Sequence, residues 1–184
     1  TTGNLAGSNA GANDVFVSKF TESGDLLWTR QFGTSGNDDG TRIAADTLGN
    51  VYIAGQTDGN LGETNAGMRD MFISKWDALG EWQWTKLLGT PVDERADAEI
   101  DVDELGNVYV SGRTTGDLFA PNSGAWDAFI ARFDSHGNLT WGIQGGTSQS
   151  DWPGGVAVDG AGTVYLTGGT YGALAGEWAG NYDV

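Results

Sequence analysis

The stretch GNVYIAGQTDGNL, residues 49–61, holds the pattern that decides the fold of this chain. Its last five residues have the form T-x-G-x-L, and the same form begins at Thr1, Thr57, Thr114 and Thr170. An aspartate lies nine residues after each leucine, at Asp14, Asp70, Asp127 and Asp183. Successive aspartates are 56, 57 and 56 residues apart. A fixed period of this length indicates a repeat architecture.

The period makes residues 1–184 a single repeat region with units 1–56, 57–113 and 114–169 and a partial unit 170–184. The second unit has one extra residue, which lies between Gly89 and Asp103. Residues 1–15 and 170–184 overlap in repeat phase, and the chain does not begin with Met. We therefore expect a processed or excised piece of a longer protein.

Four short strands are predicted for each unit, and in the first unit they are residues 14–20, 26–32, 41–45 and 51–55. The connecting segments 21–25 and 46–50 contain glycine, which tolerates the positive φ of tight turns. Asp46 opens the second of these turns, where an aspartate can accept backbone N–H groups two residues on. Because no segment has a sustained helical period, we predict an all-β fold.

The first strand of each unit is apolar on both faces. In the first unit Phe16 and Phe20 lie on one face, and Val15 and Val17 lie on the other. A sheet with two apolar faces is expected to be covered on both sides. Antiparallel four-stranded units of 40–57 residues that stack face to face are typical of the blades of a β-propeller.

Four short motifs connect the repeat to a known family. Residues 49–55 (GNVYIAG), 57–61 (T-x-G-x-L), 66–72 (A-G-x-x-D-x-F) and 80–85 (G-x-x-x-W-T) resemble the bacterial SBBP β-propeller repeat, and the resemblance extends over the whole chain. It implies a propeller-forming, secreted or cell-surface bacterial protein, usually a non-catalytic part of a larger chain. Residues 156–165 are similar, more weakly, to NHL-type repeats, which implies that the strands at Asp46, Asp103 and Asp159 lie innermost.

The resemblance also sets the expected blade boundaries. Complete four-stranded antiparallel blades are predicted at about 41–88 and 98–145, with half blades at 155–168 and 14–32. The chain would then hold about three blades' worth of a propeller, below the usual range of about 4–8. Either the propeller is partial, or copies of the chain associate and complete it.

Composition excludes several classes of function. The chain has no Cys, one His and a net charge of −16, from 9 basic and 25 acidic residues. The absence of Cys excludes disulfides and thiolate metal sites, and the negative field disfavours nucleic acid. No apolar run is long enough to insert into a membrane. His136 lies in a predicted surface turn, and no catalytic motif is present, so we predict no enzyme activity.

Several recurring positions are candidates for chemistry. Carboxylates gather after each Gly-Thr pair, and we take Asp38, Asp39, Asp93 and Asp151 as candidate Ca²⁺ ligands, since Ca²⁺ prefers oxygen. The position before each recurring aspartate varies and is often large. With nearby aromatic residues it gives the candidate binding residues Arg69, Trp126, Trp152, Trp178 and Tyr182.

Two further recurring positions are predicted to be structural. Lys19, Lys75 and Arg132 are expected to form ion pairs between blades; the recurring aspartate is one candidate partner, and the sequence does not identify the partner. Trp28, Trp84 and Trp141 are expected in the core between blades.

These observations favour a non-catalytic extracellular propeller segment that serves as a structural or protein-interaction module. One alternative is a calcium-dependent, lectin-like propeller that binds carbohydrate or protein. Another is a self-assembling cell-surface or filament subunit, in which the copies cover each other's sheet edges. No cofactor is assigned with certainty from the sequence, and Ca²⁺ is a candidate ligand in the lectin-like alternative.

Overall fold

Twelve β-strands make up the regular structure of this protein. The computed structural model describes residues 1–174, apart from the side chain of Ala98. Its strands are β1 (Val15–Phe20), β2 (Leu26–Phe32), β3 (Asp38–Ala45), β4 (Val51–Thr57), β5 (Asp70–Trp76), β6 (Trp82–Leu88), β7 (Glu94–Val102), β8 (Val108–Thr114), β9 (Asp127–Phe133), β10 (Leu139–Gly145), β11 (Asp151–Val158) and β12 (Val164–Thr170). This part of the chain contains no helix, and so none that could span a membrane. The prediction of an all-β fold is confirmed.

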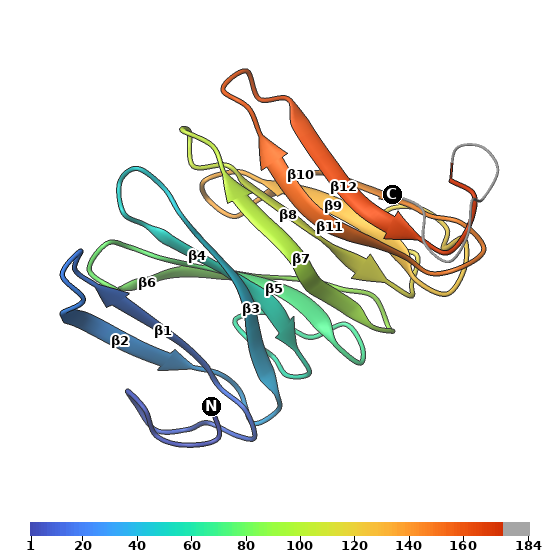
Figure 1. Ribbon diagram of the computed structural model, residues 1–184. Helices are drawn as coiled ribbons and strands as arrows, with labels where there is room; N and C mark the ends of the chain where they lie inside the picture. The colour runs from blue at the N-terminus through green and yellow to red at the C-terminus, as the bar shows by residue number, and fades with distance from the viewer. Residues whose placement is uncertain (175–184) are drawn as a thin grey trace.

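The strands form four antiparallel sheets that follow one another along the chain (Figure 1). The N-terminal sheet is β1-β2, and the C-terminal sheet is β11-β12. Between them lie the first four-stranded sheet, β3-β4-β5-β6, and the second, β7-β8-β9-β10. The first strands of three sheets, β3, β7 and β11, pack side by side. The sheets therefore stack with β3, β7 and β11 next to one another, and these three strands are called the inner strands.

Tight turns that contain a positive-φ glycine join β1 to β2, β3 to β4, β5 to β6, β7 to β8, β9 to β10 and β11 to β12. In the turn after β3, Asp46 Oδ1 accepts the N–H groups of Leu48 and Asn50 at 3.0 and 2.9 Å. Gly49 follows with φ of 81°, a conformation that only glycine adopts without strain. The predicted aspartate–glycine turn is confirmed here, and it recurs after β5, β7, β9 and β11.

The extra residue of the second unit lies in an inner strand. In β7 the register with β8 shifts between Arg95 and Glu99, whereas in β3 and β11 the shift spans only Gly40 to Arg42 and Pro153 to Gly155. A bulge accommodates an inserted residue because the extra residue is left out of the ladder. The remaining strands of the unit therefore keep the common register.

The hydrophobic core lies between sheets. Its largest cluster joins Tyr52 and Ile73 of the first four-stranded sheet to Ile100 and Val108 of the second. Met71, Phe72 and Ile73 are consecutive in β5 and are all fully buried, so this strand is covered on both faces as its sequence predicts. The packing of one sheet on the next therefore supplies most of the apolar burial.

The two-stranded sheets differ from this pattern. Phe16 in β1 is 53% exposed, whereas Phe72 and Phe129 at the equivalent positions of β5 and β9 are fully buried. The prediction that both faces are covered is therefore wrong for the N-terminal sheet. Phe72 and Phe129 pair with a neighbouring strand on the side where β1 has none.

Candidate interaction surfaces

A basic residue and a tryptophan join the N-terminal sheet to the first four-stranded sheet. Lys19 Nζ and Trp28 Nε1 both donate hydrogen bonds to the backbone carbonyl of Ala78, at 3.0 and 3.3 Å. Ala78 lies in the turn between β5 and β6. Gly80 in the same turn lies against the Trp28 ring, where a Cβ would come within 2.9 Å of the indole. The turn is thus held in a socket on the preceding sheet.

The same socket recurs between the two four-stranded sheets. Lys75 Nζ and Trp84 Nε1 donate to the carbonyl of Ser135, at 3.3 and 3.4 Å. A Cβ at Gly137 would lie 3.0 Å from the Trp84 ring. The same kind of contact therefore joins two successive pairs of sheets. It confirms the prediction that Trp28 and Trp84 lie between sheets.

The ion pairs predicted for the basic position are wrong. Lys19 and Lys75 donate to turn carbonyls of the next sheet, and no described salt bridge includes either residue. Arg132 donates instead to Tyr109 Oη at 3.1 Å and to Thr140 Oγ1 at 3.1 Å. A carbonyl acceptor satisfies a cation between sheets without bringing in a second buried charge.

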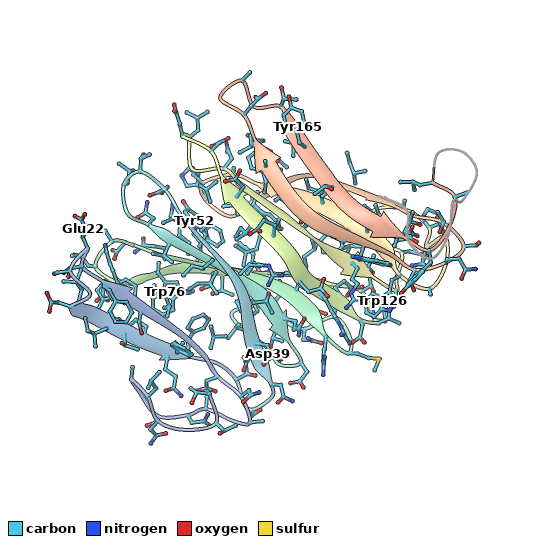
Figure 2. The ribbon with its side chains drawn as sticks, viewed as in Figure 1. Glu22, Asp39, Tyr52, Trp76, Trp126 and Tyr165 are labelled. Carbon is cyan, nitrogen blue, oxygen red and sulfur yellow. The ribbon has the colours of Figure 1, made fainter. Side chains whose placement is uncertain are left out.

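A third socket is present, and no turn within residues 1–174 occupies it. Arg132 and Trp141 take the places of Lys75 and Trp84, and Tyr109 takes the place of Tyr52. Beside them lies a cleft of about 650 Å³, bounded on its other side by the turn between β11 and β12. Figure 2 shows Tyr165, on β12, at this margin of the molecule and Glu22, in the turn between β1 and β2, at the opposite margin.

The predicted metal residues lie in or beside three strands: Asp38 and Asp39 begin β3, Asp93 precedes β7, and Asp151 begins β11. Asp38 and Asp151 are buried at equivalent places in β3 and β11, and each accepts the backbone N–H four residues earlier at 2.6 Å. Asp39 accepts a hydrogen bond from Asn13 at 3.4 Å, and Asp93 lies 3.7 Å from the Arg95 guanidinium. Residues 1–174 contain no group of three or more His, Cys, Asp or Glu side chains placed to hold a metal.

Glu94 shares the position of Asp38 and Asp151, although sequence reasoning did not single it out. It is fully buried, and its carboxylate accepts hydrogen bonds at 2.7 Å from Thr90 N, Thr90 Oγ1 and Thr114 Oγ1. Burial raises the pKa of Glu94 above its ordinary value, and the nearby Asp70 adds to the rise, while the threonine hydrogen bonds oppose it. Burial likewise raises the pKa of Asp70.

The recurring aspartates after the T-x-G-x-L loops hold those loops. Asp14, Asp70 and Asp127 are buried, and each Oδ2 accepts the backbone N–H four residues earlier. Each Oδ1 has no hydrogen-bond partner among the residues that the structure describes, and it lies against a glycine, Gly33, Gly89 or Gly146. These glycines are the first residue of the repeated Gly-Thr pair. A side chain at the glycine would collide with the carboxylate.

The turn aspartates are held as anions by local donors. Partial burial on its own would raise the pKa of Asp46, but hydrogen bonds from Asn50, Tyr52 and Leu48 lower it below the ordinary value. Asp103 has the same set of donors, and its pKa is also lowered. Burial is the largest single cause in these turns, but the hydrogen bonds to the charged form together outweigh it.

The fold places two of the predicted binding residues, Trp126 and Trp152, on neighbouring segments, because the N–H of Asp151 donates to the carbonyl of Trp126 at 2.7 Å. Trp126 and Trp152 are half-buried, and the Trp152 ring contacts the Tyr171 ring at 5.0 Å between centroids. Arg69 pairs through its backbone with Asp93. Trp178 and Tyr182 lie outside the described residues.

Trp126 lies among cations that sequence reasoning did not connect with it. The guanidinium carbons of Arg95 and Arg113 lie 5.1 and 4.7 Å from its ring centroid. Arg113 is also paired with Asp97 at 2.8 Å. In a chain with only 9 basic residues, two of them contact one half-exposed indole. In the repeat alignment Arg95 takes the position of Asp39 in the first unit and of Trp152 in the third, and this variability is the signal that the sequence offers.

Comparison with known proteins adds relatives that share only part of their length with this chain. The chain is 30% identical over 168 residues to the regulatory protein FlaEY of Caulobacter vibrioides, covering 82% of this chain and 18% of that protein. It is 26% identical over 149 residues to an uncharacterized WD repeat-containing protein of Acanthamoeba polyphaga mimivirus, and this match covers 71% of the present chain and 11% of the viral protein. The chain therefore spans less than a fifth of either relative.

A solved structure and a family model complete the comparison. A crystal structure of a protein of unknown function from Bacteroides caccae aligns with a TM-score of 0.49 and 16% identity, covering 87% of this chain and 51% of that one. The family model of the SBBP beta-propeller repeat matches residues 27–63 and 83–120. The first match includes β3 and β4, and the second includes β7 and β8. The chain thus carries SBBP beta-propeller repeats at residues 27–63 and 83–120.

Proposed function

We propose that this chain is a non-catalytic structural module of an extracellular bacterial β-propeller protein, and that it joins further propeller repeats through the free edges of its end sheets. One observation carries the proposal. The socket that receives a turn of the next sheet is built and filled twice. It is built a third time beside Arg132 and Trp141, where none of the turns in the described part of the chain fills it.

The outer edge of the C-terminal sheet exposes an aromatic residue whose equivalent is buried between sheets. Tyr165 in β12 is 59% exposed, whereas Tyr52 at the equivalent position is fully buried beneath the next sheet. Unpaired, apolar sheet edges are aggregation sites that proteins normally protect. An edge that residues 1–174 leave uncovered, and that repeats the sequence of an internal interface, is suited to accept another repeat. In this proposal each four-stranded sheet is one blade.

The non-catalytic part of the proposal is supported by the use of the acidic groups. Asp38, Glu94 and Asp151 are buried and bonded to neighbouring threonines, and the turn aspartates are bonded to their own turns. The extracellular bacterial setting follows from the resemblance to bacterial SBBP proteins. A relative from Caulobacter vibrioides, described as regulatory, is consistent with a module that binds rather than catalyses.

A hairpin peptide tests the join directly. A synthetic peptide of residues 68–90, which contains β5, β6 and their turn, is titrated into the full chain by calorimetry. We expect saturable binding at one site, because the peptide carries the turn and the strand that fill the internal socket. The matched control peptide has Phe72→Glu, which places a charge at a position that is buried in the intact sheet. Equal binding of both peptides, or no binding of either, contradicts the proposal.

Carbohydrate or protein binding at Trp126 is a second candidate, favoured by the two guanidinium groups at its ring. Its calcium-dependent form is tested by the melting temperature in millimolar Ca²⁺ and after chelation. A large rise with Ca²⁺ that chelator reverses supports that form, because a ligand of the folded state stabilises it. An unchanged melting temperature counts against it.

A further inference from the structure

Three of the nine basic residues of this acidic chain gather at the start of β7. Arg95 of β7 and Arg113 of β8 are directly opposite each other in the ladder. The carbonyl of the third, Arg69, accepts the N–H of Glu94 at 2.8 Å, so its backbone lies beside the start of β7. The second four-stranded sheet has a described sheet on either side, because β7 packs against β3 and β11. The cluster therefore lies within the stack of sheets.

Two arginines opposite each other are an unfavourable pair. Like charges directly across a ladder repel each other, and the repulsion lowers stability. The equivalent pairs in the neighbouring sheets are Asp39 with Gln56 and Trp152 with Gly169, and neither of these pairs repels. Departures of this kind from the local rules are expected at functional sites. The arginine pair therefore asks for an explanation beyond the packing of the sheet.

The two guanidinium groups are neutralised unequally. Arg113 donates from Nε to Asp97 Oδ2 at 2.9 Å, and its Nη2 lies 2.8 Å from the same oxygen. Arg95 Nη2 lies 3.7 Å from Asp93 Oδ2, which is too long for a hydrogen bond. Arg95 Nε is buried, and no atom of the described residues accepts a hydrogen bond from it. Arg95 is therefore a partly desolvated cation with an incomplete set of acceptors.

A ligand can still reach this cation. The Arg95 side chain is 30% exposed, so atoms other than the buried Nε are open to solvent. Trp126 lies beside it (Figure 2), with the guanidinium groups of Arg95 and Arg113 over its ring. A ring covered in this way leaves little surface on which a sugar could stack. The site offers positive charge beside an indole, and arginine and tryptophan are the residues that contribute most to binding at protein interfaces.

We propose that this face binds an acidic peptide segment of a partner protein, with an aspartate or glutamate carboxylate on Arg95 and the Trp126 indole as the apolar contact. The inference rests on the second candidate function above, because it names the class of ligand at Trp126, and it does not depend on the join between sheets. Asp97 and Arg113 already show this pairing within the chain. A carboxylate from the partner gives Arg95 the acceptor and the counter-charge that Asp97 gives Arg113, through the strong hydrogen bonds that form between ionised groups.

The net charge of the chain restricts an acidic ligand to this place. A charge of −16 repels an acidic segment from most of the surface. Salt screens this repulsion beyond about 8–10 Å, so the groups in contact with the ligand decide whether it binds. At the start of β7 those groups include three arginines, and elsewhere carboxylates outnumber cations. The same segment is therefore accepted at Arg95 and rejected on other faces.

Arginine side-chain NMR tests the proposal on the full chain. Substitution of each arginine by lysine in turn assigns the Nε–H signals. A short, end-capped peptide of glutamates should shift the Nε–H signal of Arg95 and the indole N–H signal of Trp126 in a saturable way. A glutamine peptide of the same length and with the same end groups is the matched control, and it should shift neither signal.

Two substitutions should change the affinity for the glutamate peptide in opposite directions. Arg95→Gln should weaken binding about tenfold or more, because a hydrogen bond between charged groups is lost. Asp97→Asn removes the counter-charge of Arg113 and should tighten binding roughly two- to fivefold. A misfolded variant would not bind more tightly, so this gain separates the proposal from an effect on the fold.

Arg30→Gln is the matched control for the loss of one positive charge. Arg30 also lies over a tryptophan ring, 5.6 Å from the centroid of Trp28, and its side chain is 34% exposed. Its guanidinium differs from that of Arg95 because it donates to backbone carbonyls of the turn after β5. Arg30→Gln should therefore leave the affinity for the glutamate peptide unchanged.

The outcomes separate failure of this inference from failure of the function on which it rests. If a neutral oligosaccharide shifts the Trp126 signal and the glutamate peptide does not, the acidic peptide is refuted and the second candidate function stands. If neither ligand shifts the signal, both are refuted. Equal affinity for the glutamate and glutamine peptides, or an affinity that ignores both Arg95→Gln and Asp97→Asn, also overturns the inference. Calorimetry with the hairpin peptide of residues 68–90 tests the join separately.

Discussion

Two adjacent glycines at the end of β10 offer a sharp test of why the Gly-Thr pair recurs. A Cβ at Gly146 would lie 2.6 Å from Asp127 Oδ1 and 2.7 Å from Asp151 Oδ2. Both carboxylates are buried. A Cβ at Gly145, its neighbour, would have nothing within 4 Å. Neither glycine has a positive φ, so alanine is opposed only by the space available.

The structure sets the size of the expected effect. Gly146→Ala must push two carboxylates aside, and such overpacking costs about 1–3 kcal/mol. The shift also disturbs the hydrogen bond from Thr147 N to Asp151, which is 2.6 Å long, and that from Ser123 N to Asp127, which is 3.0 Å long. Weakening bonds to buried groups adds about 1 kcal/mol. We expect a total loss of about 3 kcal/mol, a fall in melting temperature of roughly 6–12 °C.

Urea unfolding followed by tryptophan fluorescence measures the loss. Gly145→Ala should change the free energy of unfolding by less than about 0.5 kcal/mol, as surface substitutions usually do. Gly146→Ala should cost less in an Asp127→Ala background, because one of the two obstacles is gone, and the coupling should be about 1 kcal/mol or more. Equal stabilities of the Gly145→Ala and Gly146→Ala proteins would refute the steric explanation. So would a cost at Gly146 that is independent of Asp127.

Three further outcomes are expected. Because burial raises the pKa of Asp70 and Glu94, the folded state binds protons there more tightly than the unfolded state does. The contribution of these two groups to the free energy of unfolding should therefore rise as the pH falls from 7 through the raised pKa values. Urea titrations at several pH values should show this rise, and Glu94→Gln should make the pH dependence flatter. Thr57→Val removes the 2.5 Å hydrogen bond to buried Asp38 and should cost about 1–3 kcal/mol in the same urea assay. Lys75→Met removes a donor to the next sheet and should cost about 1 kcal/mol in calorimetry, and an unchanged melting temperature would contradict the socket described above.

Local chemistry explains why much of the fold could be predicted from the sequence. The strand positions of the first unit agree with the prediction to within a few residues, since alternating apolar residues and Asp-x-x-Gly turns are properties of short segments. The inner strands begin earlier than predicted, at Asp38 rather than Thr41. Asp38 is polar and so gave no strand signal in its own segment. Its side chain is buried because it accepts a hydrogen bond from Thr57, a residue of the neighbouring strand β4.

The contacts between sheets could not be predicted in the same way. Repeat columns identified Lys19 and Lys75 as equivalent, but the partner of each is a backbone carbonyl, which has no sequence signature. The exposure of Phe16 also depends on which strand is absent beside it rather than on its own segment. The two guanidinium groups at Trp126 come from β7 and β8, and only the folded chain brings them to the ring.

The large negative charge has a structural explanation in this fold. Five turn aspartates each accept the N–H groups two and four residues on, and they are Asp46, Asp77, Asp103, Asp134 and Asp159. Six loop carboxylates each accept the N–H four residues earlier, and they are Asp14, Asp38, Asp70, Glu94, Asp127 and Asp151. These eleven are nearly half of the 25 acidic residues. A backbone N–H bonded to a carboxylate is stronger than one bonded to a neutral acceptor, so a chain without disulfides can hold its tight loops in this way. This part of the charge is therefore a consequence of how the loops are held, and a cation site must be sought among the remaining carboxylates.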